Sequence, residues 1–315
     1  MKAFVLAAGL GTRLRPLTNH SPKPLMPVLN VPSLFYTLFL LKEAGIGEVI
    51  CNIHYHAAQM RSVVEAHNLA GLQITFSEEP EILGTGGGLK KCEALLEGED
   101  FVLVNSDIIT SIDFRALIER HRISGNLGTL ALYETPDAAS IGWVGVEDGL
   151  VKDFRNQRHT NLFSSFIYTG TAVLSPDIFR YMHAEYSSIV DTGFAALLER
   201  NSLGYYEHCG LWMDVGTLPH YWQANLDATG AIRRTFGAMQ QSFGVAPHVV
   251  APSATISPAA TVENSVVGAD CVIPDGCTVR NSVLLSGVVL QPNTPLCNAI
   301  ADSQTVTILE PSSLL

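Results

Sequence analysis

The chain has 315 residues, of which 47% are hydrophobic and 16% charged, so it has the composition of a folded globular protein and enough length for one large α/β domain and a smaller module. Its net charge of −11 argues against a nucleic-acid partner, because Lys and Arg are not in excess, although nucleotides need only a few local cations. The longest near-continuous apolar run, at 34–41, is too short to span a bilayer, so no membrane partner is expected. Six cysteines without a C-x-x-C pair indicate reduced, mostly buried thiols. No signal peptide is recognisable, so a cytoplasmic protein is expected.

Strand-like and helix-like segments alternate through the first half of the chain. The apolar run from Ala3 to Ala7 ends before Gly9, as a buried parallel strand would. The segments expected after it are a helix at 34–44, a strand at 48–53, a helix at 57–67, a strand at 72–76, a helix at 88–96 and a strand at 100–104. This alternation predicts an α/β fold with right-handed crossovers and a parallel sheet. Ligands of such sheets bind beyond the carboxyl ends of the strands, where we expect the turn at Gly9 and, after a later strand, Asp107.

A change of pattern near residue 247 predicts a second domain. Apolar residues recur there at intervals of six, with two intervals of five, at Val250, Ile256, Val262, Val267, Ile273, Val279, Leu284 and Leu290. A six-residue period is typical of a parallel β-helix, in which each repeat is one short strand and a turn. An irregular β-rich tail is the alternative. We therefore predict a catalytic-size domain at 1–235, with a helix from Leu218 towards Gln241, a β-helix at 247–300 and a tail at 301–315.

The strongest motif follows the first strand. It reads L-A-A-G-L-G-T-R-L-R-P-L-T and continues at residue 22 as P-K-P-L-M-P-V. Gly9 and Gly11 allow a tight turn whose N–H groups face an anion, and Arg13 and Lys23 add two cations that suit a triphosphate. The run lacks the Lys-Ser/Thr ending of a P-loop and the third glycine of a dinucleotide fingerprint.

These residues resemble the signature of the sugar-1-phosphate nucleotidyltransferase family. Further matches follow in the expected order: E-P-E-I-L-G-T-G-G-G at 79–88, V-N-S-D at 104–107, Y-T-G at 168–170 with L-S-P at 174–176, and W-M-D-V-G-T at 212–217. The resemblance covers about residues 1–230. It implies a Rossmann-like nucleotidyltransferase domain with a mixed, mostly parallel sheet, and a left-handed β-helix is also common at the C-terminus of such proteins.

The resemblance also implies a reaction and a set of site residues. A sugar 1-phosphate oxygen attacks the α-phosphorus of a nucleoside triphosphate in line, and pyrophosphate leaves, so positioning and charge neutralisation dominate. The metal ligands would be Asp107 and Asp214, holding Mg²⁺ between the two reacting phosphates, and the catalytic cations would be Arg13 and Lys23. The nucleotide would be bound by Leu6, Ala8, Gly9, Gly11, Thr12, Glu79, Gly84, Thr85 and Gly87, and the sugar by Gly142, Thr169 and Gly170.

Simpler interpretations exist for several of these residues. Asp107 could cap a helix and Asp214 could close a turn; two aspartates in matching motifs favour the metal role. The glycines at 84–88 suit a close approach to a base, but also a helix N-terminus that needs a loose backbone. Glu79 could read the N–H groups of guanine or orient its own loop.

One departure from the family affects the substrate. The family often has Glu-Lys-Pro after the strand at 150–154, whereas this chain has Arg155-Asn156-Gln157-Arg158, so Arg155 or Arg158 would replace the lysine that contacts the sugar phosphate. Two pairs of substrates remain open. GTP with mannose or heptose 1-phosphate is slightly favoured, and UTP with N-acetylmuramate or glucose 1-phosphate comes next. A non-catalytic regulatory subunit and an acyltransferase in the β-helix are the alternatives from other classes. A homo-oligomer formed through the β-helix is also expected.

Overall fold

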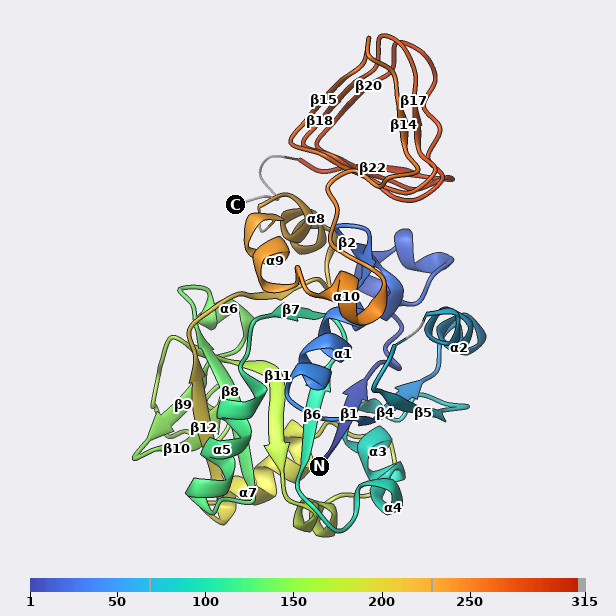
Figure 1. Cartoon of the computed structure of the whole chain (residues 1–315). Coiled ribbons are helices and arrows are strands. Elements are labelled where there is room, and N and C mark those ends of the chain that lie inside the picture. The colour runs from blue at the N-terminus through green and yellow to red at the C-terminus, as the bar shows by residue number, and fades with distance from the viewer. Residues whose placement is uncertain (68, 228, 311–315) are drawn as a thin grey trace. The chain divides into compact units, whose positions relative to one another are not determined.

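The computed structural model describes residues 1–67, 69–227 and 229–310, and it divides into two compact units (Figure 1). The sheet unit comprises Met1–Gly9, Thr37–Val64 and Ala70–Trp212; the β-helix unit comprises Leu10–Tyr36, Glu65–Leu69 and Met213–Leu315. Three elements contain a boundary between the units: α1 (Ser33–Glu43), α2 (Ala57–Ala66) and β13 (Trp212–Asp214). The domain limits predicted from the sequence, at residues 235, 247 and 300, do not coincide with the limits of these two units and remain a prediction.

A nine-stranded sheet forms the centre of the sheet unit, in the order β5-β4-β1-β6-β11-β8-β12-β10-β9. The pairs β5–β4, β4–β1, β1–β6 and β8–β12 are parallel, and the other four are antiparallel. The mixed sheet expected from the sequence is therefore confirmed. The strands are β1 (Lys2–Leu6), β4 (Glu48–Ile53), β5 (Gln73–Glu78), β6 (Phe101–Asn105), β8 (Gly128–Glu134), β9 (Val144–Glu147), β10 (Leu150–Phe154), β11 (Phe166–Leu174) and β12 (Leu203–His208); β7 (Ile108–Thr110) lies outside this sheet.

The register of the parallel strands aligns their carboxyl ends. Leu6 at the end of β1 is level with Asn52 of β4 on one side and with Asn105 of β6 on the other. The middle of β1 is fully buried, with Phe4 in one apolar core, because a central strand is covered on both faces. Polar residues that follow these three strands therefore meet at one edge of the sheet.

Helices of the sheet unit connect these strands. Besides parts of α1 and α2, they are α3 (Gly84–Lys91), α4 (Glu93–Leu96), α5 (Phe114–Ser124), α6 (Ala138–Ile141) and α7 (Ala195–Glu199), with a 3₁₀ turn at Pro176–Tyr181 and a π turn at Val190–Phe194. The single helix predicted at 88–96 was wrong in its limits: it begins four residues earlier and is interrupted at Cys92. Within the described residues, no helix is both long enough and apolar enough to cross a membrane.

The β-helix unit begins with the loop that follows β1. This loop holds three 3₁₀ turns, at Thr12–Leu14, Leu17–Asn19 and Lys23–Leu25, and then a small hairpin of β2 (Pro27–Val28) and β3 (Val31–Pro32). The helix predicted from Leu218 towards Gln241 is instead three short helices, α8 (Leu218–Leu226), α9 (Thr229–Thr235) and α10 (Met239–Phe243).

The hexapeptide pattern forms a β-helix whose coils trace the three sides of a triangle (Figure 1). Aligned residues of neighbouring coils, such as Val279 and Leu296, are 17 positions apart, which equals two intervals of six and one of five. The strands are β14 (Thr255–Ile256), β15 (Thr261–Glu263), β16 (Val266–Val267), β17 (Val272–Ile273), β18 (Thr278–Arg280), β19 (Val283–Leu284), β20 (Pro295–Cys297), β21 (Ala299–Ala301) and β22 (Val306–Ile308). All neighbours are parallel except β22, which returns antiparallel to β21 within the predicted tail. The end of that tail, 311–315, lies outside the described residues.

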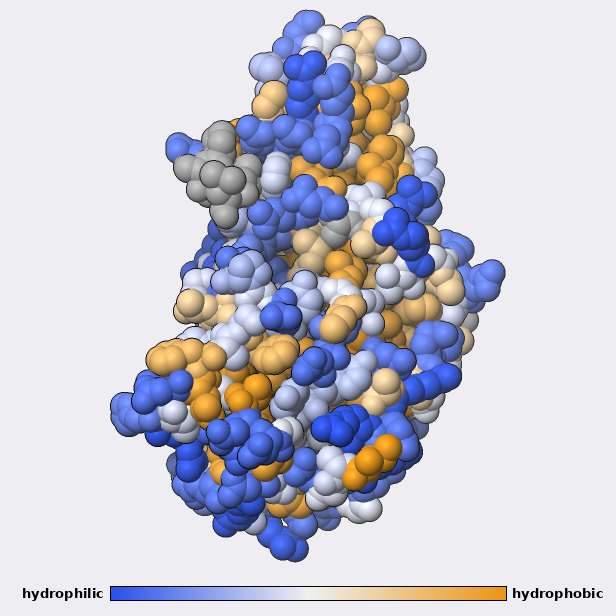
Figure 2. Space-filling model, turned by 90° about the vertical axis from the view of Figure 1, so that its left-hand side faces the viewer, coloured by the Kyte–Doolittle hydropathy of each residue, from blue (hydrophilic) through white to orange (hydrophobic). Residues whose placement is uncertain are grey.

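The periodic apolar residues fill the interior of the β-helix from the second coil onward. Val267, Ile273 and Val279 are almost completely buried, whereas Val250 at the start is 41% exposed. Burying each such side chain contributes about 1.5–3 kcal/mol. Figure 2 also shows hydrophobic side chains on the outside of the β-helix, at the top of that view.

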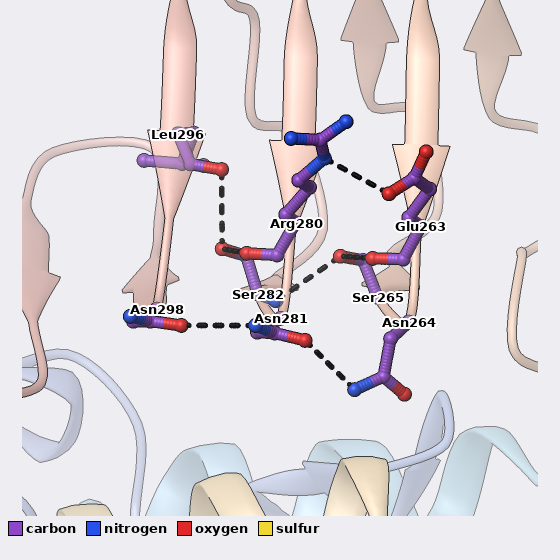
Figure 3. Close-up of polar contacts among 8 residues, drawn as sticks. All are labelled: Glu263, Asn264, Ser265, Arg280, Asn281, Ser282, Leu296 and Asn298. Atoms are coloured by element: carbon purple, nitrogen blue, oxygen red, sulfur yellow. Dashed lines mark hydrogen bonds and ion pairs between the residues drawn. The ribbon is translucent and has the colours of Figure 1, made fainter. Parts of the chain in front are cut away.

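Polar side chains form a ladder along one corner of the β-helix (Figure 3). Asn264 Nδ2 donates to Asn281 Oδ1 (2.9 Å), and Asn281 Nδ2 donates to Asn298 Oδ1 (3.1 Å). All three residues have positive φ, between 42° and 50°, which asparagine adopts more readily than most residues. The corner turn thus explains why asparagine recurs every 17 residues.

The cysteines are free thiols, as expected. Cys51, Cys92, Cys271 and Cys277 are buried, and Cys209 and Cys297 are exposed. Burial raises the pKa of Cys51 to about 12, which keeps this residue protonated and unreactive.

Candidate functional site

The predicted nucleotide loop leaves the sheet at the carboxyl end of β1. Ser106 donates two hydrogen bonds to Leu6 O, from its backbone N (3.2 Å) and from its Oγ (2.7 Å). On the other side, Ala7 N donates to Asn52 Oδ1 (2.7 Å). The loop therefore starts from a fixed point: Ala8 is buried and Gly9 is exposed, with nothing near the position of a Cβ.

Glu79 lies buried beside this point, only 2% exposed, and both of its carboxylate oxygens have partners within the protein. Asn52 Nδ2 donates to Glu79 Oε1 (2.7 Å), and Leu83 N donates to Glu79 Oε2 (2.9 Å). Asn52 thus connects the end of β1 with the segment that leads into α3. These contacts agree with the loop-orienting interpretation of Glu79, and a contact with a base remains a prediction.

The glycines of α3 are packed against another part of the chain. A Cβ on Gly84 would lie 2.5 Å from Ser187 O, and one on Gly87 would lie 2.1 Å from Glu185 O. The Thr85 hydroxyl accepts a hydrogen bond from Ile189 N (2.9 Å). Close packing with 185–189 therefore accounts for a glycine-rich helix that propensity alone disfavours. Whether the same residues also contact a nucleotide remains a prediction.

Asp107 follows β6 at the same edge, and the strand across from it carries the predicted sugar residues. Gly170 lies in β11 with φ +82°, and a Cβ there would be 2.7 Å from Asn105 Nδ2. Thr169 is buried and its Oγ1 donates to Ala131 O (2.8 Å), while its carbonyl accepts from Trp212 Nε1 (3.1 Å). Positive φ and the adjacent amide together explain why glycine occupies position 170.

The predicted sugar-contacting turn at Gly142 is covered by an arginine. Gly142 has φ +129°, and a Cβ there would be 2.2 Å from Arg155 Nε. The guanidinium of Arg155 donates to Ile141 O (2.7 Å). Arg158, three residues on, instead lines a surface cavity of about 320 Å³ whose other residues include Lys152 and Glu199. Of the two candidates for the missing lysine, Arg155 is thus the one beside a predicted sugar residue.

The remaining site residues lie in the β-helix unit, where the second half of the nucleotide loop packs on its own continuation. Gly11 has φ +64°, and a Cβ there would lie 3.0 Å from Thr18 Cγ2 and 3.2 Å from Lys23 Cβ. Thr18 is buried and its Oγ1 donates to Gly11 O (2.7 Å). Thr12 and Arg13 are exposed in the turn between them. The hydrogen bond from Thr18 explains why a threonine accompanies Gly11 in the sequence motif.

Three charged side chains converge around Gly216. The point where a Cβ of Gly216 would lie is 2.6 Å from Asp214 Oδ1, 2.6 Å from Lys23 Nζ and 3.1 Å from Arg13 Nη2. Gly216 N also donates to Asp214 Oδ1 (2.6 Å). The fold thus gathers two cations and a carboxylate from segments about 200 residues apart in sequence, and only a glycine leaves room for all three.

The carboxylate of Asp214 has the chemistry of a ligand for a divalent metal ion such as Mg²⁺. Carboxylate oxygens are its preferred protein ligands, and it is commonly held by one or two carboxylates together with substrate phosphates and water. Among the residues that the structure describes, no group of three or more His, Cys, Asp or Glu side chains is arranged to hold a metal. Asp214 beside Lys23 and Arg13 suits a metal ion that binds together with phosphate, because the two cations also attract phosphate.

The structure thus brings together Arg13, Lys23 and Asp214 in one unit, and it places Leu6, Ala8, Asp107, Thr169 and Gly170 along one edge of the sheet in the other. Four further residues make contacts at these sites that had not been predicted: Thr18, Asn52, Asn105 and Gly216. Three of them stood inside the quoted motifs, whereas Asn52 had no signal beyond its position at a strand end.

Comparison with known proteins decides the family. Residues 2–230 match the family model described as Nucleotidyl transferase. The chain belongs to the nucleotidyl transferase family. Residues 234–312 match the model described as GlmU-like, C-terminal hexapeptide, so both parts of the predicted resemblance are confirmed. Nucleotidyl transferases of this kind generally use a divalent metal ion.

Relatives of this nucleotidyl transferase carry one recurring name. It is 36% identical over 220 residues to the mannose-1-phosphate guanylyltransferase catalytic subunit beta of Drosophila pseudoobscura pseudoobscura, a match that covers 68% of this chain and 59% of that protein. Probable mannose-1-phosphate guanylyltransferases 1 and 2 of Oryza sativa subsp. japonica are 32% and 30% identical, covering 92% and 95% of this chain and 80% and 85% of theirs. The chain thus spans about six tenths of the Drosophila relative and most of each rice relative.

Solved structures confirm the fold of the nucleotidyl transferase part. HddC from Yersinia pseudotuberculosis, complexed with GMP-PN, superposes with a TM-score of 0.59 at 24% identity, covering 71% of this chain and 97% of that one.

Proposed function

We propose that the protein transfers GMP from GTP to mannose 1-phosphate or a closely related sugar 1-phosphate and releases pyrophosphate. The observation that carries this proposal is the match, over more than nine tenths of the chain, to two proteins named mannose-1-phosphate guanylyltransferase. Arg13, Lys23 and Asp214 around Gly216 support a phosphate-transfer site. A sugar phosphate oxygen forms a bond to the α-phosphorus, the bond from that phosphorus to the β-phosphate oxygen breaks, and the electron pair leaves on pyrophosphate.

The chain's own residues orient and neutralise the phosphates in this proposal. Lys23 contacts the phosphates at the reacting centre, and Arg13 stabilises the departing pyrophosphate. Both side chains are long cations in a polar loop, and charge-assisted hydrogen bonds to phosphate are about twice as strong as neutral ones. Leu6, Ala8, Gly9, Gly11 and Thr12 supply the backbone around the nucleotide. Their fixed starting point at Ser106 and Asn52 keeps the loop in one position, which helps to orient the phosphates.

The proposed metal ligands are Asp107 and Asp214, and the proposed metal is Mg²⁺. When bound, this ion would offset charge on the reacting phosphates. Removing divalent metal with EDTA is expected to abolish turnover and added Mg²⁺ to restore it. Asp107→Ala and Asp214→Ala should each lower kcat by at least about 10²-fold, and full activity in either variant would remove that aspartate from the site.

For the sugar phosphate, we propose Arg155 in place of the lysine that the family often uses. Its guanidinium covers Gly142 and suits a phosphate. Arg155→Ala should raise the KM for the sugar phosphate, while Arg158→Ala, which alters the separate cavity, serves as the matched control. An equal effect of both variants would contradict the choice of Arg155.

The proposal as a whole is tested by pyrophosphate release. GTP, UTP, dTTP, CTP and ATP are each combined with mannose, heptose, N-acetylmuramate and glucose 1-phosphates in the presence of Mg²⁺. A signal confined to GTP with mannose or heptose 1-phosphate supports the proposal. A signal confined to UTP would replace it with the uridylyltransferase alternative, and silence from folded protein that still binds a nucleotide would favour the regulatory subunit.

Self-association through the β-helix is the proposed oligomeric arrangement. Val289 (62% exposed) and Ile308 (61% exposed) support it, because large apolar side chains on a repeat surface are often covered by a second copy. Sedimentation of the chain and of Val289→Glu checks this. A monomer at all concentrations for the unchanged chain would contradict it.

A further inference from the structure

The hairpin of β2 and β3 follows directly after Lys23 and has a strained turn. Val28 pairs with Val31, so the two residues between them, Leu29 and Asn30, form the whole turn. Both have positive φ, 47° and 68°, as a type I′ turn requires. Leucine rarely adopts this conformation, and Leu29 is nevertheless completely buried. The surroundings must therefore hold the turn.

The first two coils of the β-helix supply most of the bonds that stabilise the turn. Asn30 Nδ2 donates to His248 O (2.9 Å) and to Val267 O (3.1 Å). In return, His248 N donates to Leu29 O (2.8 Å). From α8, Asn225 Oδ1 accepts a hydrogen bond from Leu29 N (2.9 Å), and Asn225 itself is fully buried. All of these groups belong to the β-helix unit.

The helix α8 makes a second connection of the same kind. Its Trp222 Nε1 donates to Asn281 O (2.7 Å), at the corner of the β-helix that also carries the asparagine ladder. Its Tyr221 hydroxyl donates to Pro27 O in β2. Because α8 begins at Leu218, with Thr217 as its N-cap directly after Asp214 and Gly216, both segments that carry the charged cluster are bonded to the β-helix.

Fixing the hairpin also restricts the position of Lys23, because the segment between them is short and hydrogen-bonded. Met26 N donates to Lys23 O (3.0 Å), and Ser33 N donates to Met26 O (3.1 Å). The Ser33 hydroxyl also donates to Pro24 O (3.1 Å). The backbone from Lys23 to Ser33 is thus fixed at both ends of the hairpin.

We propose that Asn30 is a positioning residue for Lys23, and that its amide ties the turn to the start of the β-helix, at His248 and Val267, so that the β-helix holds the phosphate-binding lysine in place. This inference rests on the proposed function of Lys23. It gives the β-helix a part in the reaction besides any part in assembly. A purely structural role for Asn30 is the alternative, and the two differ in whether nucleotide affinity depends on Asn30 through Lys23.

The test uses GTP with Mg²⁺ and measures its Kd by calorimetry on the full chain. Asn30→Gly removes the amide but keeps the positive φ without strain. The matched control is Asn298→Gly, which also replaces an asparagine of positive φ but removes a ladder bond to Asn281 and no bond to the hairpin. The fitted stoichiometry reports the folded fraction, so a loss of folded protein does not mimic a change of Kd.

Lys23→Ala should weaken GTP binding about tenfold, the lower range for a charge-assisted hydrogen bond. Asn30→Gly should weaken it about threefold or more, Asn298→Gly should leave it unchanged, and Asn30→Gly should add nothing in the Lys23→Ala background. If Asn30→Gly binds GTP normally while Lys23→Ala binds it weakly, the positioning role of Asn30 is overturned and the proposed function of Lys23 stands. The same holds if Asn30→Gly weakens binding equally in both backgrounds. Normal affinity in Lys23→Ala would remove the proposed function of Lys23 and the inference with it.

Discussion

Replacing Gly216 by alanine should lower the activity of the protein and leave its stability nearly unchanged. Its Cβ would lie 2.6 Å from both Asp214 Oδ1 and Lys23 Nζ, whereas ordinary contact begins at 3.4 Å, so these atoms must move by about 3.4 − 2.6 = 0.8 Å. All are ends of flexible side chains, and the φ of Gly216 is outside the left-handed region, so the fold accommodates alanine. A displacement near 1 Å at a reacting centre costs on the order of 10²-fold in rate.

We therefore expect kcat/KM of Gly216→Ala to fall about 10²-fold, while the free energy of unfolding stays within about 1 kcal/mol of the unchanged protein. Pyrophosphate release measures the first quantity and urea unfolding the second. Gly230→Ala is the matched control, because its Cβ meets only Arg234 Nη1 at an ordinary 3.4 Å. A Gly216→Ala protein that keeps kcat/KM within about threefold would refute the convergence of charges as the basis of activity.

Three further predictions concern the sheet unit. Asn52→Ala should lower the free energy of unfolding in urea by about 2–4 kcal/mol, because it removes the partner of Ala7 N and that of the buried Glu79 Oε1; a loss below about 1 kcal/mol would contradict this. Gly170→Ala should lower the melting temperature through about 1–3 kcal/mol of strain at φ +82° and contact with Asn105, and an unchanged midpoint would argue against it. Burial lowers the pKa of His208 below its ordinary 6.5, so the unfolded chain binds the proton more readily and stability should fall as pH drops below 6.5. Urea midpoints from pH 7.5 to 5 should depend less on pH in His208→Gln, and an identical dependence would exclude His208 as a source.

The sequence predicted the β-helix well because its repeat is local. Each interval of five or six residues places one side chain in the interior, and two sixes and a five return the chain to the same side after 17 residues. The exposed Val250 departs from the pattern because no earlier coil covers it. Strand β4 also agrees with prediction residue for residue, since its apolar run suits a buried strand, and β10 has the limits that the family resemblance implied for it.

The site was harder to predict wherever partners are distant in sequence. The residues that neighbour Gly216 in sequence do not indicate that Arg13 and Lys23 lie beside it, because only the fold brings them together. The glycines of α3 suggested room for a base, but the residues that require them, at 185–189, have no distinctive pattern. Periodicity gives the elements; long-range packing decides which of their polar residues meet.

The attachment of the β-helix at one end has a consequence for how such a chain can change in length. Its bonds to the hairpin and to α8 involve positions 248, 267 and 281, in the first two coils, while the opposite end is closed by β22. Insertions or deletions of a whole coil beyond Asn281 would leave every one of those bonds in register, whereas a change of one or two residues would shift the stack. In lineages that diverge from this chain, the length of the array should therefore evolve in steps of one coil, and from the closed end.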